Sequence, residues 1–355
     1  MRRRSFLLAP LLFPGLAAAT TTTPYAPAKR GTTLAFPRDH GGHADFRTEW
    51  WYVTGALDLP ERDIGFQLTF FRVRSGSAET LDSPFAPTQI LFAHAAVTLP
   101  GGRLLHAERA ARAGLGAAFS ATDCDVHIGP WRMRRSGSGA GEQIRLRALD
   151  PGFAFDLRLT PTQPLLLQGE NGWSQKGPRP ELASHYVSWP QLRVEGQLTL
   201  DNTSRTAGGR AWFDHEWSSE VLGDAGIGWD WIGINLDDGG ALMAFRIRDQ
   251  AGATVYAYAG LRDASGRQTR FGPAEVSFTV LRQWQSPRSG GSYPVGMEIA
   301  VGPHVVRTVP VLDDQEIATR RPLPISYWEG LVKLEGTLRG RGYLELTGYS
   351  GRMAL

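Results

Sequence analysis

The residues best suited to chemistry in this sequence are crowded into positions 210–238, which read RAWFDHEWSSEVLGDAGIGWDWIGINLDD. This segment holds four of the chain's eleven tryptophans, together with several acids and a histidine. A carboxyl group buried beside large apolar rings tends to stay protonated, because burial disfavours its charged form, and such a group can act as an acid on an apolar ligand. The same residues also suit a packed β-core, in which indole N–H groups find hydrogen-bond partners.

Strand alternation divides the GWDWIGINL run into two faces. Successive side chains of a strand point to opposite sides, so Trp229 and Trp231 share one face and Asp230 lies on the other. These three residues cannot all line one cavity unless the strand bends or bulges there. Either Asp230 is a catalytic acid and the tryptophans are packing, or the tryptophans line a pocket and the acid comes from the DHEW run.

The DHEW run supplies the remaining candidate catalytic residues. By the same alternation, Asp214 and Glu216 share one face of this run, and His215 shares the other face with Trp217. The candidate catalytic residues are therefore Asp230, His215, Asp214 and Glu216, and a hydrogen-bonded structural role is the alternative for each of them.

Polar or amphipathic side chains interrupt three strand-like runs in the first half of the chain. His94 lies in ILFAHAAVTL, Gln67 lies in GFQLTFF, and Tyr186 lies in HYVSWP. A lone histidine in an apolar strand is commonly a satisfied core residue, but in the wall of a cavity it can carry a proton. We treat these three residues as candidate ligand-binding residues.

The sequence lacks the usual signatures of metal, nucleophilic and phosphate-binding sites. His40 and His43 have no third ligand at a zinc-like spacing. There is no G-x-S-x-G elbow, and no G-x-G-x-x-G loop opens a helix. Cys124 is the single cysteine and is flanked by acids, which disfavour a thiolate. We therefore expect a site that works without a catalytic metal.

Short β-prone runs separated by turn residues fill most of the sequence. The chain contains 42 glycines and 23 prolines, and the runs recur at intervals of about ten residues with no helical crossovers between them. This pattern predicts an all-β protein whose antiparallel sheets close into barrels or sandwiches. The number of runs suits two barrels of about eight strands each better than one.

The length of 355 residues exceeds the usual size of a single core and so favours two domains. The weakest part of the middle is residues 182–205, where a strand ends in the turn DNTSRTAGG, so the domain boundary should lie within residues 190–208. We therefore predict a flexible lead at 20–33, a first domain at 34–198 and a second domain at 199–355.

The N-terminus MRRRSFLLAPLLFPGLAAAT has a basic start, an apolar run and a small-residue site, which predicts a secretory signal at residues 1–19 and a periplasmic or extracellular protein. Arg3 and Arg4 also fit the twin-arginine pattern. Removing Arg2, Arg3 and Arg4 lowers the formal net charge from +3 to zero. A neutral chain without a basic patch excludes nucleic acid as the expected partner.

Several motifs in order resemble the AttH-like family, which includes the carotenoid 1,2-hydratases (hydroxyneurosporene synthases) and exported bacterial proteins known as predicted secreted hydrolases. The resemblance runs from about residue 36 to the C-terminus. It rests on EWWYVTGAL, GFQLTFFR, AHAAVT, NGWSQKG, AWFDHEWSS, GWDWIGINLDDG, YWEGLV and GYLELTGY.

The resemblance implies two lipocalin-like β-barrels packed together, with a cavity lined by the aromatic motifs, and cofactor-free catalysis on a large apolar substrate. Protonation of a C=C bond would give a tertiary carbocation that water captures. The resemblance assigns Asp230 as the acid and His215 as the base that positions water. It assigns the cation-stabilising walls to tryptophan rings, and the proposed substrate-binding set is Trp229, Trp231, Trp217, Trp51, Tyr52, Gln67, His94 and Tyr186.

Three functions remain open on the sequence alone. The leading one is an exported hydratase-type enzyme that processes an isoprenoid-like or lipid substrate. The alternatives are a lipocalin-like carrier for a lipophilic ligand and a secreted hydrolase. The expected partner in each case is an apolar small molecule or lipid, with transient contact at a membrane surface, and the sequence does not fix the oligomeric state.

Overall fold

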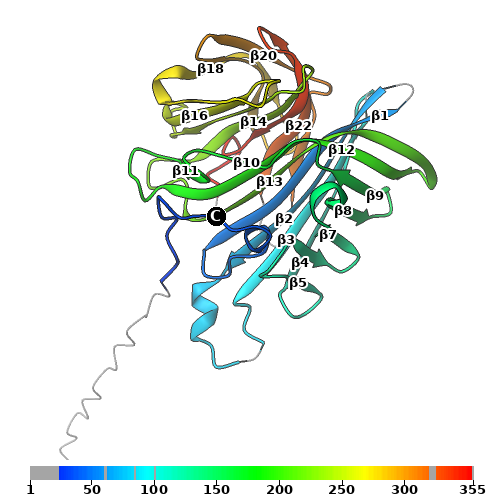
Figure 1. Ribbon diagram of the computed structural model, residues 1–355, viewed down its shortest axis with the longest axis vertical. Coiled ribbons are helices and arrows are strands. Elements are labelled where there is room, and N and C mark those ends of the chain that lie inside the picture. The colour runs from blue at the N-terminus through cyan, green and yellow to red at the C-terminus, as the bar shows by residue number, and fades with distance from the viewer. Residues whose placement is uncertain (1–23, 60–61, 84, 100, 320–324, 354–355) are drawn as a thin grey trace, which may run out of the picture.

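The computed structural model describes residues 24–59, 62–83, 85–99, 101–319 and 325–353. The protein is all-β, with two curled antiparallel sheets that form a barrel and a half-barrel of lipocalin-like character (Figure 1). The predicted signal at residues 1–19 lies outside the described residues. Within the part of the chain that is described, no helix combines the length and the apolar character needed to cross a bilayer.

The first sheet has the strand order β4-β3-β2-β1-β13-β12-β9-β8-β7-β6-β5, with β10 and β11 paired to β12. A bridge between Ala113 and Ala117 links the end of β4 to β5 and helps to curl the sheet. Its strands are β1 (Thr48–Leu59), β2 (Arg62–Arg74), β3 (Gln89–Leu99), β4 (Arg103–Arg112), β5 (Ala117–Phe119), β6 (Asp125–Ile128), β7 (Trp131–Ser136), β8 (Gln143–Leu149), β9 (Phe153–Thr160), β10 (Leu166–Leu167), β11 (Trp173–Gln175), β12 (Ala183–Leu200) and β13 (Thr203–Glu220).

The second sheet has the order β17-β16-β15-β14-β23-β22-β20-β19-β18, with β21 paired to β22. Its strands are β14 (Gly228–Leu236), β15 (Ala241–Arg248), β16 (Thr254–Arg262), β17 (Gln268–Phe271), β18 (Val276–Gln285), β19 (Ser292–Val301), β20 (His304–Pro310), β21 (Glu316–Ala318), β22 (Ser326–Gly336) and β23 (Gly340–Leu346).

The change from one sheet to the other lies later in the chain than the predicted boundary at 198/199. Strands β12 and β13 form one long antiparallel hairpin of the first sheet. Asp201 and Asn202 have positive φ values of 47° and 61°, which asparagine and aspartate tolerate in tight turns. The turn-rich stretch is therefore the tip of a hairpin, and the chain crosses to the second sheet at residues 221–227.

The three largest apolar clusters of the described residues account for most of the core packing. One fills the first sheet and another fills the second. The third lies between the sheets and contains side chains from both, including Tyr52, Trp212, Trp231, Met243 and Tyr343. Strand β1 is buried along nearly its whole length, because one of its faces packs in the first cluster and the other packs in the third. Side chains that alternate along the shared strands thus point either into a barrel or into the space between the barrels.

Candidate active site

An apolar cavity of about 130 Å³ lies between the two sheets. Aromatic and aliphatic side chains of both sheets form most of its wall, and one histidine, one lysine and three acids interrupt them. The lining residues are Trp50, Tyr52, Phe71, Val73, Phe92, Tyr186, Val221, Trp229, Trp231, Phe245, Ile247, Ile325, Tyr327 and Met353, with His94, Lys176, Asp214, Glu216 and Glu345.

Asp214 of β13 is an acid of the cavity wall that accepts three hydrogen bonds from side chains. Its carboxyl oxygens accept hydrogen bonds from the Tyr186 hydroxyl (2.7 Å), the Ser188 hydroxyl (2.5 Å) and the Trp212 indole N–H (2.7 Å). Complete burial raises the pKa of Asp214 to about 7, although these three donors act in the opposite direction. A carboxyl with this pKa can give up a proton near neutral pH and take it back.

Tyr186 of β12 connects Asp214 to the cavity. Its hydroxyl oxygen also accepts a hydrogen bond from the Trp231 indole N–H at 3.0 Å, and burial raises the pKa of the Tyr186 phenol well above its ordinary value. When Asp214 is protonated, its O–H can donate to the Tyr186 oxygen, which frees the phenol hydrogen to point elsewhere. The pair is thus arranged as a short proton relay.

Glu216 and Lys176 form a buried ion pair at the cavity wall, with 2.9 Å between Lys176 Nζ and Glu216 Oε1. The Lys176 ammonium also lies 4.7 Å from the Tyr186 ring centroid and 4.2 Å from that of Phe245. Attraction between a cation and a ring face grows when the pair is removed from water. The cavity therefore stabilises one positive charge already.

Glu345 and Glu329 face each other across β23 and β22. Glu345 lines the cavity and accepts a hydrogen bond from the Trp229 indole N–H at 2.9 Å. Burial raises the pKa of Glu345 to about 7. Burial and the neighbouring charge of Glu345 raise the pKa of Glu329 well above its ordinary value, and Gln67 donates to Glu329 at 2.5 Å. Two adjacent carboxyls in one site cannot easily both ionise, so this pair retains a proton.

Sequence reasoning missed Glu345, Glu329 and Lys176. A usable signal existed for Glu345, because GYLELTGY places this acid between two leucines of a strand. The same pattern, an acid between two apolar residues of a strand, singles out Asp230. No periodic pattern marks Lys176, which follows the short strand β11.

Asp230 does not share the cavity with Trp229 and Trp231. Its carboxyl group lies inside the second sheet and accepts from Arg246 Nε (2.6 Å), Arg248 Nε (2.9 Å) and the Tyr349 hydroxyl (2.9 Å). The tryptophans line the cavity from the other face of β14. Of the two hypotheses drawn from strand alternation, this geometry favours an acid from the DHEW run and gives Asp230 a structural role.

His215 and Trp217 also point away from the cavity. His215 Nε2 lies 2.9 Å from Glu49 Oε1, and its Nδ1 lies 3.1 Å from the Asp39 carbonyl oxygen. The Trp217 ring stacks on His43 at 3.8 Å between centroids. His215 therefore cannot position water beside Asp214, because the two side chains leave opposite faces of β13.

The remaining predicted ligand-binding residues divide between the cavity and its surroundings. Tyr52 and His94 line the cavity with Tyr186. The His94 Nδ1 lies 2.7 Å from the Tyr327 hydroxyl, and burial lowers the pKa of His94 to about 3. Gln67 lies behind the wall and contacts Glu329. Trp51 belongs to the core of the first sheet, where its indole donates to the His40 carbonyl at 3.0 Å.

One group of three potential metal ligands occurs among the described residues, namely His43, Glu49 and His215. Glu49 Oε1 lies between the two rings, 2.8 Å from His43 Nδ1 and 2.9 Å from His215 Nε2. Arg72 Nε donates to the other Glu49 oxygen at 2.8 Å. These are hydrogen-bond distances, and the guanidinium would repel a metal ion. The group therefore fits a hydrogen-bonded network better than a metal centre.

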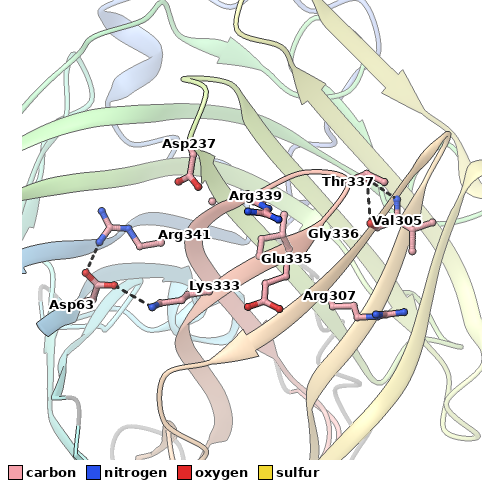
Figure 2. Close-up of a pocket in the computed structure, with 12 residues that line it drawn as sticks. Asp63, Asp237, Val305, Arg307, Lys333, Glu335, Gly336, Thr337, Arg339 and Arg341 are labelled. Carbon is pink, nitrogen blue, oxygen red and sulfur yellow. Dashed lines mark hydrogen bonds and ion pairs between the residues drawn. The ribbon is translucent and has the colours of Figure 1, made fainter.

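A larger groove of about 950 Å³ lies on the surface, and its charged lining is shown in Figure 2. Three of its basic groups have acidic partners: Arg341 donates to Asp58 and Asp63, and Lys333 lies 3.9 Å from Asp63. Arg307 pairs with Glu298. Exposed pairs of this kind are weak and well solvated. The smaller cavity is a better candidate site than this groove, because it combines acids of raised pKa with largely apolar walls.

The raised pKa of Asp214 predicts a pH-dependent stability difference between the wild type and Asp214→Asn. An acid whose pKa is higher in the folded state binds protons more tightly there, so its favourable contribution is complete below its unfolded pKa near 4 and is lost as pH rises to about 7. The lowered pKa values of His40, His94 and His185 change the stability in the opposite sense, so only the difference between the two proteins is diagnostic. Between pH 5 and pH 7, the free energy of unfolding of the variant should rise relative to that of the wild type by up to about 1.4 kcal/mol per pH unit, as measured by urea unfolding. A difference that stays constant would contradict the assigned shift.

The fold and the cavity define a lipocalin-like β-barrel protein with an aromatic, acid-lined site between its two sheets. The family model described as AttH-like matches residues 27–349, and the chain belongs to the AttH-like family. The family resemblance seen in the sequence is thus confirmed. No curated protein sequence matches the chain.

Solved structures agree with this assignment. A protein assigned as AttH from Nitrosomonas europaea is 44% identical, with a TM-score of 0.85 over 91% of this chain and 99% of its own. Kievitone hydratase from Nectria haematococca is 14% identical, with a TM-score of 0.66 over 93% and 97%. CghA is 12% identical, with a TM-score of 0.51 over 86% and 90%. The last two likenesses show a shared fold.

Proposed function

We propose that this protein is a cofactor-free hydratase, which adds water across a carbon–carbon double bond of an apolar, isoprenoid-like or lipid substrate. The observation that carries the proposal is the relay of Asp214 and Tyr186, whose acid has a pKa of about 7, in the wall of an aromatic cavity. One relative that shares the fold is itself a hydratase, named for kievitone.

The proposed reaction begins with proton transfer from Asp214, through the Tyr186 hydroxyl, to one alkene carbon. The π electrons form the new C–H bond and leave a carbocation at the more substituted carbon. The ring faces of Trp229 and Trp231, which line the cavity, would stabilise this positive charge. Water then forms the C–O bond, and its surplus proton passes to an ionised carboxyl, for which Glu345 is suited by its pKa of about 7.

The size of the cavity restricts what enters it. Its volume of about 130 Å³ is below the ~300 Å³ of small-molecule pockets in general and close to the ~150 Å³ that accommodates a benzene ring. We therefore propose that the reacting end of the substrate enters, and that any longer apolar chain extends beyond the cavity. An acyclic gem-dimethyl alkene end is small enough to enter and gives the tertiary cation required by the mechanism.

Export of the protein and transient contact with a membrane surface are proposed on the sequence alone. The support is the basic, then apolar, then small-residue order of MRRRSFLLAPLLFPGLAAAT. An exported enzyme of this type would meet lipophilic substrates at a membrane.

The hydratase proposal predicts a specific isotopic product. Purified protein is incubated in D₂O containing ¹⁸O-labelled water with lycopene and, separately, with a short 2-methyl-2-alkene. We expect a tertiary alcohol that carries one ¹⁸O and one carbon-bound deuterium, detected by mass spectrometry, because the acid and the water both exchange with solvent. Binding of the alkene without any alcohol from either substrate would identify a carrier instead. Cleavage of an ester probe without hydration would favour the hydrolase.

A further inference from the structure

Lys176 is chemically unusual within this chain. The sequence contains only three lysines, at positions 29, 176 and 333, against thirty-five arginines. Lys29 is exposed and the side chain of Lys333 is 56% exposed, whereas that of Lys176 is 6% exposed and lines the cavity. A primary amine is therefore placed inside an apolar, ring-sized site, where the water-addition mechanism gives it no chemical step.

The other buried cations show why a lysine at this position matters. Arg72, Arg246 and Arg248 pair with buried carboxylates and serve as permanent charges. An arginine cannot lose its proton in a protein, whereas a lysine amine can, and its free form is a nucleophile. A simple structural ion pair with Glu216 would be met equally well by arginine, which this chain uses elsewhere.

We propose that Lys176 is a covalent capture site, at which the amine forms a reversible imine with an apolar aldehyde or ketone held in the cavity. The inference does not depend on water addition to an alkene, since it uses a different atom and a different bond.

The contacts around Nζ provide for each step of imine formation. The ammonium first passes a proton to Glu216, whose Oε1 lies 2.9 Å away. The free amine adds to the carbonyl carbon, and proton transfers give a neutral carbinolamine. Glu216, which now holds that proton, returns it to the hydroxyl group of the carbinolamine, and this group leaves as water while the nitrogen lone pair forms the C=N bond. The net change is loss of one water for each imine formed.

The same surroundings favour the product. The iminium formed in the last step keeps the positive charge of the ammonium at the same place. It therefore keeps the Glu216 counter-ion and the ring faces of Tyr186 and Phe245 at 4.7 and 4.2 Å. The apolar body of the carbonyl compound gains burial in the cavity, and the largely apolar walls limit the water needed for hydrolysis.

Reductive trapping with cinnamaldehyde tests the proposal. The full chain is incubated with this ring-sized aldehyde and sodium cyanoborohydride, and adducts are located by peptide mass mapping. Lys176 should be labelled at least about tenfold faster than Lys29 or Lys333, which act as internal controls. The adduct at position 176 should vanish in Lys176→Arg. The proposal would be overturned if the exposed lysines Lys29 and Lys333 were labelled faster than the buried Lys176.

Two further measurements guard against a folding defect in the variant. In the wild type, cinnamyl alcohol should slow labelling of Lys176 and leave Lys333 unaffected, because the alcohol fills the cavity but has no carbonyl group. Without the reductant, the protonated imine should give a red-shifted absorbance that weakens in Glu216→Gln, which removes the counter-ion. Equal protection of Lys176 and Lys333, or an absorbance unchanged in Glu216→Gln, would count against capture in the cavity.

Loss of alkene hydration in Asp214→Asn with capture retained would show that the two activities are separate.

Discussion

Replacing Asp214 with asparagine is expected to reduce alkene hydration by about 10² to 10⁴-fold, the usual contribution of a positioned general acid. Asparagine has the shape of protonated aspartic acid, so its carbonyl oxygen can still accept from Ser188 and Trp212 and its amide can donate to the Tyr186 oxygen. The variant should therefore keep the fold and bind the alkene with little change in affinity. The change should appear in kcat, measured as alcohol formed under saturating substrate.

Tyr186→Phe and Ser188→Ala are the matched controls for this variant. If the proton travels through the phenol, Tyr186→Phe should lose activity to a similar degree, whereas Ser188→Ala removes only one of three donors to Asp214 and should retain most of it. Wild-type kcat should fall as pH rises through about 7, because Asp214 must be protonated to act. Full turnover by Asp214→Asn would exclude Asp214 as the acid.

The division of side chains between faces was the part of the site that the sequence could predict. Alternation alone placed Trp229 and Trp231 opposite Asp230, and Asp214 and Glu216 opposite His215, and the structure has these arrangements. Alternation cannot say which face of a strand meets the cavity. That choice depends on the partner sheet, because β1, β14 and residues 211–218 of β13 are buried on both faces.

Long-range packing explains the residues that sequence reasoning did not find. Glu329 and Glu345 are neighbours only because β22 and β23 pair in a particular register. Lys176 is buried by Tyr186 and by Phe245 of β15, which is far away in the sequence. The domain boundary was misplaced for a local reason, since a hairpin turn and a linker use the same glycine, asparagine and serine residues.

Asp230→Asn is expected to lower the free energy of unfolding by about 3–5 kcal/mol, the usual effect of breaking a buried ion pair by removing one partner. Asp230 is fully buried, and its two oxygens accept from the guanidinium groups of Arg246 and Arg248. Asparagine would leave two buried positive charges without a counter-ion and would direct an amide donor at one of them. Urea unfolding at pH 8, followed by tryptophan fluorescence, measures the change.

Asp214→Asn provides the control for Asp230→Asn, because the same chemical change is made at a second buried aspartate, 3% exposed, with different partners. Asp214 has only neutral donors around it, and at pH 8 it is above its pKa of about 7. Removing that uncompensated charge should leave the protein as stable as the wild type or more so. If the free energy of unfolding falls in Asp230→Asn and rises in Asp214→Asn, then Asp230 holds the second sheet together. Asp214 is then kept at a cost to stability, as expected for a functional acid. Equal destabilisation by both would make Asp214 a structural residue and would remove the basis for its proposed role.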